Sequence, residues 1–108
     1  MKTYKIRITP KARQNINEIA RYLKQEVSSE VASKVKNGLI EAISRLETYP
    51  EAYQAFTEIS SDKAVFRRII KWNYKIVYTV EEEELIVLVV RIYHGKKDHR
   101  EIIAELNP

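Results

Sequence analysis

Residues 85–93 read Leu85-Ile86-Val87-Leu88-Val89-Val90-Arg91-Ile92-Tyr93, and the rest of the chain must be arranged around them. The first six residues are aliphatic, and no polar residue interrupts them before Arg91. A strand that is apolar on both sides must be covered on both sides or lie inside a sheet. We therefore predict the central strand of one small domain, with the other segments as partner strands or as cover.

Upstream, the sequence predicts one strand followed by two helices. Residues 4–8 alternate between apolar and basic side chains, which is typical of a half-buried strand. Apolar residues then recur at helical spacing over residues 10–26 and again over residues 32–46, with Ser28-Ser29 as a break and an N-cap. The short link predicts an antiparallel helical hairpin. Gly38 lies within the second helix, where it lets either the first helix or a partner's backbone approach closely.

Downstream of a predicted loop over residues 50–63, we expect three further strands. The first covers residues 65–70, the second residues 74–80, and the third is the central strand, with turns at residues 71–73 and 81–84. Strands joined by such short turns form an antiparallel meander. The predicted fold is α+β with the order β-α-α-β-β-β, an antiparallel sheet covered on one face by the helical hairpin. A single domain spanning residues 1–108 is expected.

Composition narrows the classes of function. The 108-residue chain is 44% apolar and has no cysteine, which excludes disulfides and thiolate metal sites. No apolar run approaches the ~20 residues of a membrane span, so a cytoplasmic protein is expected. The net charge is +4, and the stretch from Lys63 to Lys75 holds five basic residues and no acid. Such a stretch suits a polyanionic or acidic partner, although an ordinary solvated surface explains it equally well.

Five short motifs follow one another along the chain. They are Tyr4-x-Ile6-x-x-Thr9-Pro10-x-Ala12, Ile19-Ala20-x-Tyr22-Leu23, Ala42-Ile43-x-x-Leu46-x-x-x-Pro50, Arg67-Arg68…Tyr74-x-Ile76-x-Tyr78 and Arg91-Ile92-x-His94-Gly95-x-Lys97-Asp98. In this order and spacing the chain resembles the toxins of the RelE/ParE superfamily from bacterial type II toxin–antitoxin (plasmid stabilisation) systems. The ending His94-Gly95-x-x-Asp98 looks more like the ParE branch.

The resemblance implies one of three functions. ParE-like toxins inhibit DNA gyrase by binding it, whereas RelE-like toxins are ribosome-dependent endoribonucleases that cut mRNA. A third possibility is an inactive member that only binds its antitoxin. We favour the ParE-like function, which needs a binding surface rather than a reaction centre. The candidate surface consists of basic residues on and after the later strands, namely Arg67, Arg68, Lys71, Lys75, Lys96, Lys97 and Arg100.

A ribonuclease would need a base, an acid and positive charge around one phosphate. The resemblance implies the candidates Arg67, Arg68, Lys75, His94 and Lys96. The C-terminal tyrosine common in RelE-like toxins is not matched, because no tyrosine follows Tyr93. A solvated loop is the simpler interpretation of His94 and His99. A metal site is not expected at His94, Asp98 and His99, because nearby lysines and arginines would repel a cation. We therefore expect no cofactor, and binding rather than catalysis.

The expected partner is a cognate antitoxin, forming a toxin–antitoxin hetero-oligomer. Its binding segment should be amphipathic and net acidic, lying along the helical hairpin or adding to an open sheet edge. The candidate contact residues are Ile19, Tyr22, Leu23, Leu39 and Trp72. Trp72 is either an anchor for the partner or packs back against Tyr74 or the tail.

Overall fold

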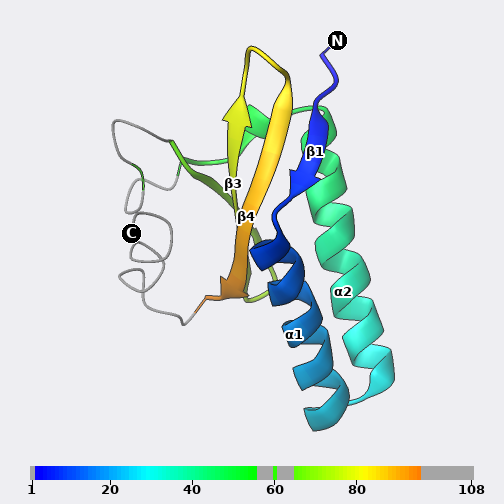
Figure 1. Ribbon diagram of the computed structural model, residues 1–108. Helices are drawn as coiled ribbons and strands as arrows, with labels where there is room; N and C mark the ends of the chain where they lie inside the picture. The colour runs from blue at the N-terminus through cyan, green and yellow to red at the C-terminus, as the bar shows by residue number, and fades with distance from the viewer. Residues whose placement is uncertain (1, 56–59, 61–64, 96–108) are drawn as a thin grey trace.

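The computed structural model describes residues 2–55, 60 and 65–95, and these follow the predicted order of elements (Figure 1). The elements are β1 (Lys5–Ile8), α1 (Pro10–Glu26), α2 (Ser29–Ser44), the 3-10 turns η1 (Arg45–Glu47) and η2 (Pro50–Ala52), β2 (Arg67–Lys71), β3 (Tyr74–Glu81) and β4 (Ile86–His94). Within the described ranges, no helix is both long and apolar enough to cross a membrane.

Side-chain caps determine where both helices begin. The Thr9 hydroxyl accepts a hydrogen bond from the Ala12 amide at 3.1 Å, and Pro10 occupies the first turn of α1. Ser28 likewise accepts from the Val31 amide at 3.1 Å at the start of α2. These caps confirm the predicted helical hairpin, whose two helices lie side by side in Figure 1.

The sheet has the strand order β1-β4-β3-β2, so the predicted central strand is an interior strand. β3 runs antiparallel to both β2 and β4, as the short turns predicted. β1, however, pairs with β4 in parallel, from Lys5 opposite Ile86 to Ile8 opposite Val89. The sheet is therefore mixed, and the expectation of antiparallel pairing throughout was wrong for β1. Antiparallel neighbours can be joined by a tight turn, whereas β1 reaches its partner only after a long connection through both helices.

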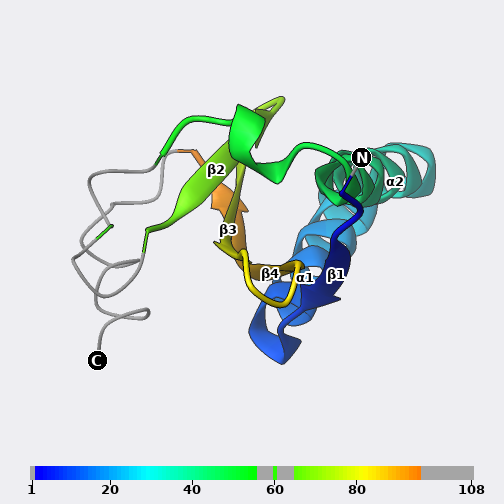
Figure 2. The same cartoon turned by 90° about the horizontal axis from the view of Figure 1, so that it is seen from above.

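The helical hairpin packs on one face of the sheet, as the view from above shows (Figure 2). Ile69, Ile76 and Ile92 lie opposite one another on β2, β3 and β4, and all three belong to the buried core. The helices contribute Ala12, Ile16, Leu39, Ala42 and Ile43 to the same core.

The pairing of β3 with β4 is interrupted by a β-bulge. Val77 pairs with Arg91 while Tyr78 pairs with Val89, so Val90 is an extra residue in β4.

Gly38 and Trp72 meet where the β2–β3 hairpin approaches α2. A Cβ atom added to Gly38 would overlap the Trp72 indole, and lie 2.7 Å from its Cζ3 atom. Gly38 therefore makes room for Trp72, and the expectation that it makes room for α1 was wrong. The approach of a partner's backbone stays a prediction. Trp72 has a φ of 54° and remains 47% exposed. The Lys71 Nζ atom lies 4.6 Å from the Trp72 ring centroid.

Candidate functional site

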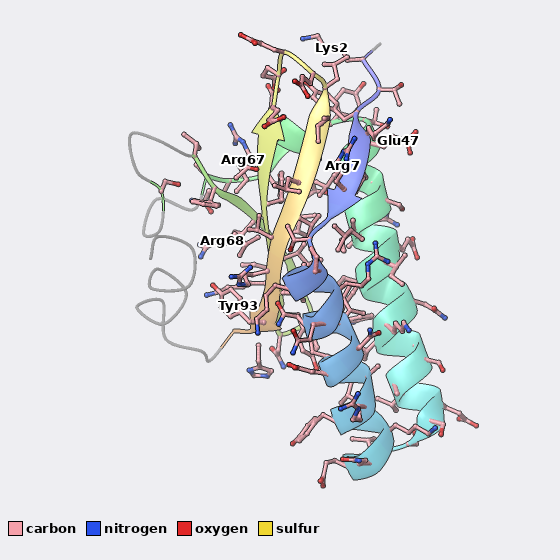
Figure 3. The ribbon with its side chains drawn as sticks, in the orientation of Figure 1. Lys2, Arg7, Glu47, Arg67, Arg68 and Tyr93 are labelled. Carbon is pink, nitrogen blue, oxygen red and sulfur yellow. The ribbon has the colours of Figure 1, made fainter. Side chains whose placement is uncertain are left out.

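Arg67 and Arg68, predicted to share one surface, point to opposite faces of the sheet because successive side chains of a strand alternate. Arg67 lies on the helix side of β2 with Ile69, and its Nη1 atom donates to the Tyr53 carbonyl at 2.7 Å. Figure 3 labels Arg67 and Arg68, whose side chains lie apart from each other. That hydrogen bond ties β2 to the segment that follows η2. Arg67 is therefore placed to hold the fold together, whereas Arg68 faces away from the helices.

The face of the sheet away from the helices carries most of the basic residues of the strands. Arg68 lies opposite Val77, and Val77 lies opposite Arg91 on the neighbouring strand. We define the basic face as Lys5, Arg7, Arg68, Lys75 and Arg91. Lys5 and Arg7 are exposed, and the other three side chains are half-buried. This arrangement brings cations from all four strands onto one face.

Sequence reasoning missed three members of the basic face. The alternation of Lys5 and Arg7 with isoleucines was visible, but their position on the same face as Arg91 depends on the pairing of β1 with β4. Lys71, which was predicted to belong, lies on the helix side next to Trp72. Lys96, Lys97 and Arg100 lie outside the described residues.

A groove runs between α1 and the ends of β3 and β4, with a volume of about 630 Å³. We call it the aromatic groove; it is lined by Asn15, Glu18, Ile19, Tyr22, Leu23, Tyr74, Ile92, Tyr93 and His94. The Tyr74 and His94 rings meet edge to face, with centroids 5.7 Å apart. Burial raises the pKa of Tyr74, and nearby Tyr22 raises it further. The groove thus combines aromatic and aliphatic side chains with polar groups from Asn15, Glu18 and His94.

The predicted antitoxin contacts separate into exposed and buried residues. Ile19, Tyr22 and Leu23 all line the aromatic groove, and Tyr22 is 63% exposed. Leu39 is fully buried in the core, so it stabilises the fold and is not available to a partner. Its neighbour Ile40 is the exposed apolar residue at this part of α2. Trp72 packs on Gly38, and 47% of its surface remains exposed.

A second, smaller hollow of about 320 Å³ lies at the tip of the β2–β3 hairpin. It is lined by Ile70, Trp72, Asn73, Lys75, His94 and Gly95, so His94 borders both hollows. The Gly95 amide donates to the Asn73 carbonyl at 2.6 Å and closes this end of the sheet. Among the residues that the structure describes, no three His, Cys, Asp or Glu side chains gather in a way that could hold a metal ion. Asp98 and His99 lie outside that part of the chain.

Three solved structures share the fold at low sequence identity. The chromosomal ParDE system from P. aeruginosa matches with a TM-score of 0.72 and 16% identity, over 87% of this chain and 98% of that one. The RelBE2 toxin–antitoxin complex from Mycobacterium tuberculosis has a TM-score of 0.60, 16% identity, and coverage of 85% and 98%. The archaeal RelE–RelB complex from Pyrococcus horikoshii OT3 has a TM-score of 0.61, 12% identity, and coverage of 89% and 99%.

Sequence comparison gives the family directly. No curated protein sequence matches this chain. The family described as "ParE toxin of type II toxin-antitoxin system, parDE" matches residues 6–99, which include both helices and all four strands except Lys5, the first residue of β1. The chain therefore belongs to the ParE toxin family of type II toxin–antitoxin systems.

Proposed function

We propose that this protein is a cytoplasmic toxin that inhibits DNA gyrase by binding it, and that a cognate antitoxin neutralises it. The match to the ParE toxin family over residues 6–99 carries this proposal. The likeness to the P. aeruginosa ParDE structure supports the fold that such a toxin needs. The basic face supplies a surface with the charge to attract an acidic or polyanionic target.

The placement of the predicted catalytic residues favours binding over cleavage. RNA cleavage requires a base, an acid and positive charge directed at a single phosphate. Arg67 donates a hydrogen bond to the Tyr53 carbonyl on the helix side of the sheet, and Arg68 lies on the opposite face. His94 pairs with Tyr74 in the sheet and Lys75 pairs with Tyr93, so these two also leave their strands on different sides. Binding needs no such convergence.

The second candidate is a ribosome-dependent endoribonuclease, and one observation favours it. Lys75 and His94 both line the hollow at the hairpin tip, because that hollow lies at the end of the sheet. The lysine supplies positive charge there, and an imidazole is a common general acid or base in RNA cleavage. The solved RelBE complexes share the fold, so the fold is compatible with both candidates.

The aromatic groove is the proposed contact for part of the antitoxin. Its residues Ile19, Tyr22 and Leu23 lie on successive turns of one helix, which suits an amphipathic partner. Several structures with this fold are toxin–antitoxin complexes, which supports an antitoxin as partner. A double substitution of Tyr22 and Leu23 by alanine should weaken such a complex and leave gyrase inhibition unchanged.

Two assays on the purified protein separate the candidates. We expect inhibition of gyrase supercoiling and no cleavage of mRNA on ribosomes. The double variant Arg68→Gln/Lys75→Gln should inhibit at least tenfold less, because it removes two charges of the basic face. Arg13→Gln/Lys34→Gln removes one arginine and one lysine from exposed helix positions and is the matched control.

Other outcomes would identify the alternatives. Ribosome-dependent cleavage that Arg68→Gln/Lys75→Gln abolishes, together with unaffected supercoiling, would establish the endoribonuclease. Cells that keep growing when the protein is induced without its antitoxin would indicate an inactive member that only binds antitoxin.

A further inference from the structure

β1 presents an open backbone edge at the border of the sheet. Within the described chain it pairs with β4 alone, and Figure 1 shows it beside α2 at the side of the sheet away from β2. The amides of Lys5 and Thr9 donate to the carbonyls of Leu85 and Val89. Since successive peptide groups of a strand point to opposite sides, the N–H and C=O groups of Ile6 and Ile8 point away from β4.

An apolar groove of about 560 Å³ lies along this edge, between β1 and α2. Ile6 and Ile8 line it from the strand, and Ile40 and Ile43 line it from the helix. Ile40 is 44% exposed, so apolar surface of α2 remains accessible here. The edge is closed at its N-terminal end, where the Tyr4 amide donates to the Glu47 carbonyl at 2.8 Å. Backbone groups and apolar surface are therefore available together from residue 5 onward.

The other side of the same edge is positively charged. Lys5 and Arg7 are exposed and project from the face away from the helices. A strand added to β1 would place alternate side chains over Ile40 and the intervening ones beside Lys5 and Arg7. The edge thus selects for a defined pattern, apolar residues on one face and acidic residues on the other.

We propose that the β1 edge binds an extended segment of the antitoxin in which apolar and acidic residues alternate. The antitoxin is named on the basis of the proposed function, whereas the pattern follows from β1 and α2 themselves. Main-chain hydrogen bonds to Ile6 and Ile8 hold the segment in the sheet. Burial of its apolar face against Ile40 stabilises it, and its acidic residues lie beside Lys5 and Arg7.

Charge determines which strands this edge accepts. Like charges placed directly opposite each other destabilise a strand pair, and lysine on an edge strand deters unwanted pairing. A second copy of this chain would bring its own Lys5 and Arg7 against the same edge, so self-pairing is disfavoured. An acidic segment meets no such repulsion, and specificity arises from the charges that exclude the other strands.

The test uses two synthetic ten-residue peptides, one alternating valine with glutamate and one alternating valine with lysine. Binding to the isotope-labelled protein is followed by NMR titration and by hydrogen exchange of backbone amides. The glutamate peptide should bind about tenfold more tightly than the lysine peptide. Its binding should slow exchange of the Ile6 and Ile8 amides, because these groups gain hydrogen-bond partners.

Charge reversal provides the decisive comparison. Lys5→Glu/Arg7→Glu should reverse the preference, so that the lysine peptide binds more tightly. Lys11→Glu/Arg13→Glu changes the same residue types at the same spacing on exposed positions of α1 and should keep the original preference. Equal binding of both peptides, or protection at other amides only, would overturn the proposal. Because gyrase is absent from this assay, failure here would not bear on gyrase inhibition, and failure in the supercoiling assay would not bear on the edge.

Discussion

At the scale of single residues, the contact between Gly38 and Trp72 can be tested by fluorescence, because Trp72 is the only tryptophan in the chain. Gly38→Ala adds a Cβ where the indole now lies. We expect the emission maximum to shift to the red as the ring moves into water. Stability should change by less than about 1 kcal/mol, because alanine favours the helix by a similar amount. Ser33→Ala, at an exposed position of α2, should leave the emission unchanged; an unshifted Gly38→Ala spectrum would contradict the contact.

Tyr78 is fully buried, and its hydroxyl donates to the Pro50 carbonyl, which joins β3 to η2. Tyr78→Phe should lower the free energy of unfolding by about 1–3 kcal/mol, because the buried carbonyl loses its donor. Urea denaturation at pH 7 measures this loss. An unchanged midpoint and slope would show that the carbonyl finds another partner.

The same tyrosine makes stability depend on pH in alkaline solution. Burial raises the pKa of Tyr78 far above its ordinary value of 10.0, with nearby Arg67 opposing this in part. Above about pH 10 the unfolded chain loses this proton while the folded chain keeps it, so stability falls as pH rises. Tyr78→Phe should reduce the slope of stability against pH between pH 9 and 11. It should not abolish the slope, because burial also raises the pKa of Tyr74.

At the scale of elements, the alternation along β2 assigns different roles to two adjacent arginines. Arg67→Gln removes the hydrogen bond to the Tyr53 carbonyl and should cost about 1–2 kcal/mol of stability. Arg68→Gln should change stability by less than about 0.5 kcal/mol and reduce target inhibition. Denaturation and supercoiling assays on both single variants distinguish the two roles. Equal effects of the two substitutions in both assays would argue against this division.

At the scale of the whole molecule, the net charge of +4 and the basic face should speed the approach of an acidic antitoxin. We expect the association rate to fall steeply as salt rises from about 50 to 500 mM, with the dissociation rate changing much less. Stopped-flow mixing with the cognate antitoxin measures both rates. An association rate independent of salt would exclude electrostatic steering.

Local sequence was sufficient to predict the two helices and four strands of this protein, but not the 3-10 turns η1 and η2. The period of apolar residues and the Thr9 and Ser28 caps predicted α1 from Pro10 to Glu26 and the start of α2, because helix formation depends on residues a few positions apart. The uninterrupted aliphatic run of residues 85–90 predicted an interior strand, because a strand that is apolar on both sides must be covered on both sides.

Tertiary structure alone decided the direction in which β1 pairs and several contacts between distant elements. Parallel and antiparallel pairing would both bury the apolar face of β1, so its residues do not specify the direction or the partner strand. The basic face, the Trp72–Gly38 contact and the groove beside Ile40 all depend on such pairings. Burial of Leu39 and exposure of Ile40 likewise follow from how α2 is turned on the sheet. These choices depend on contacts between residues far apart in the sequence, whose free energies a local pattern does not contain.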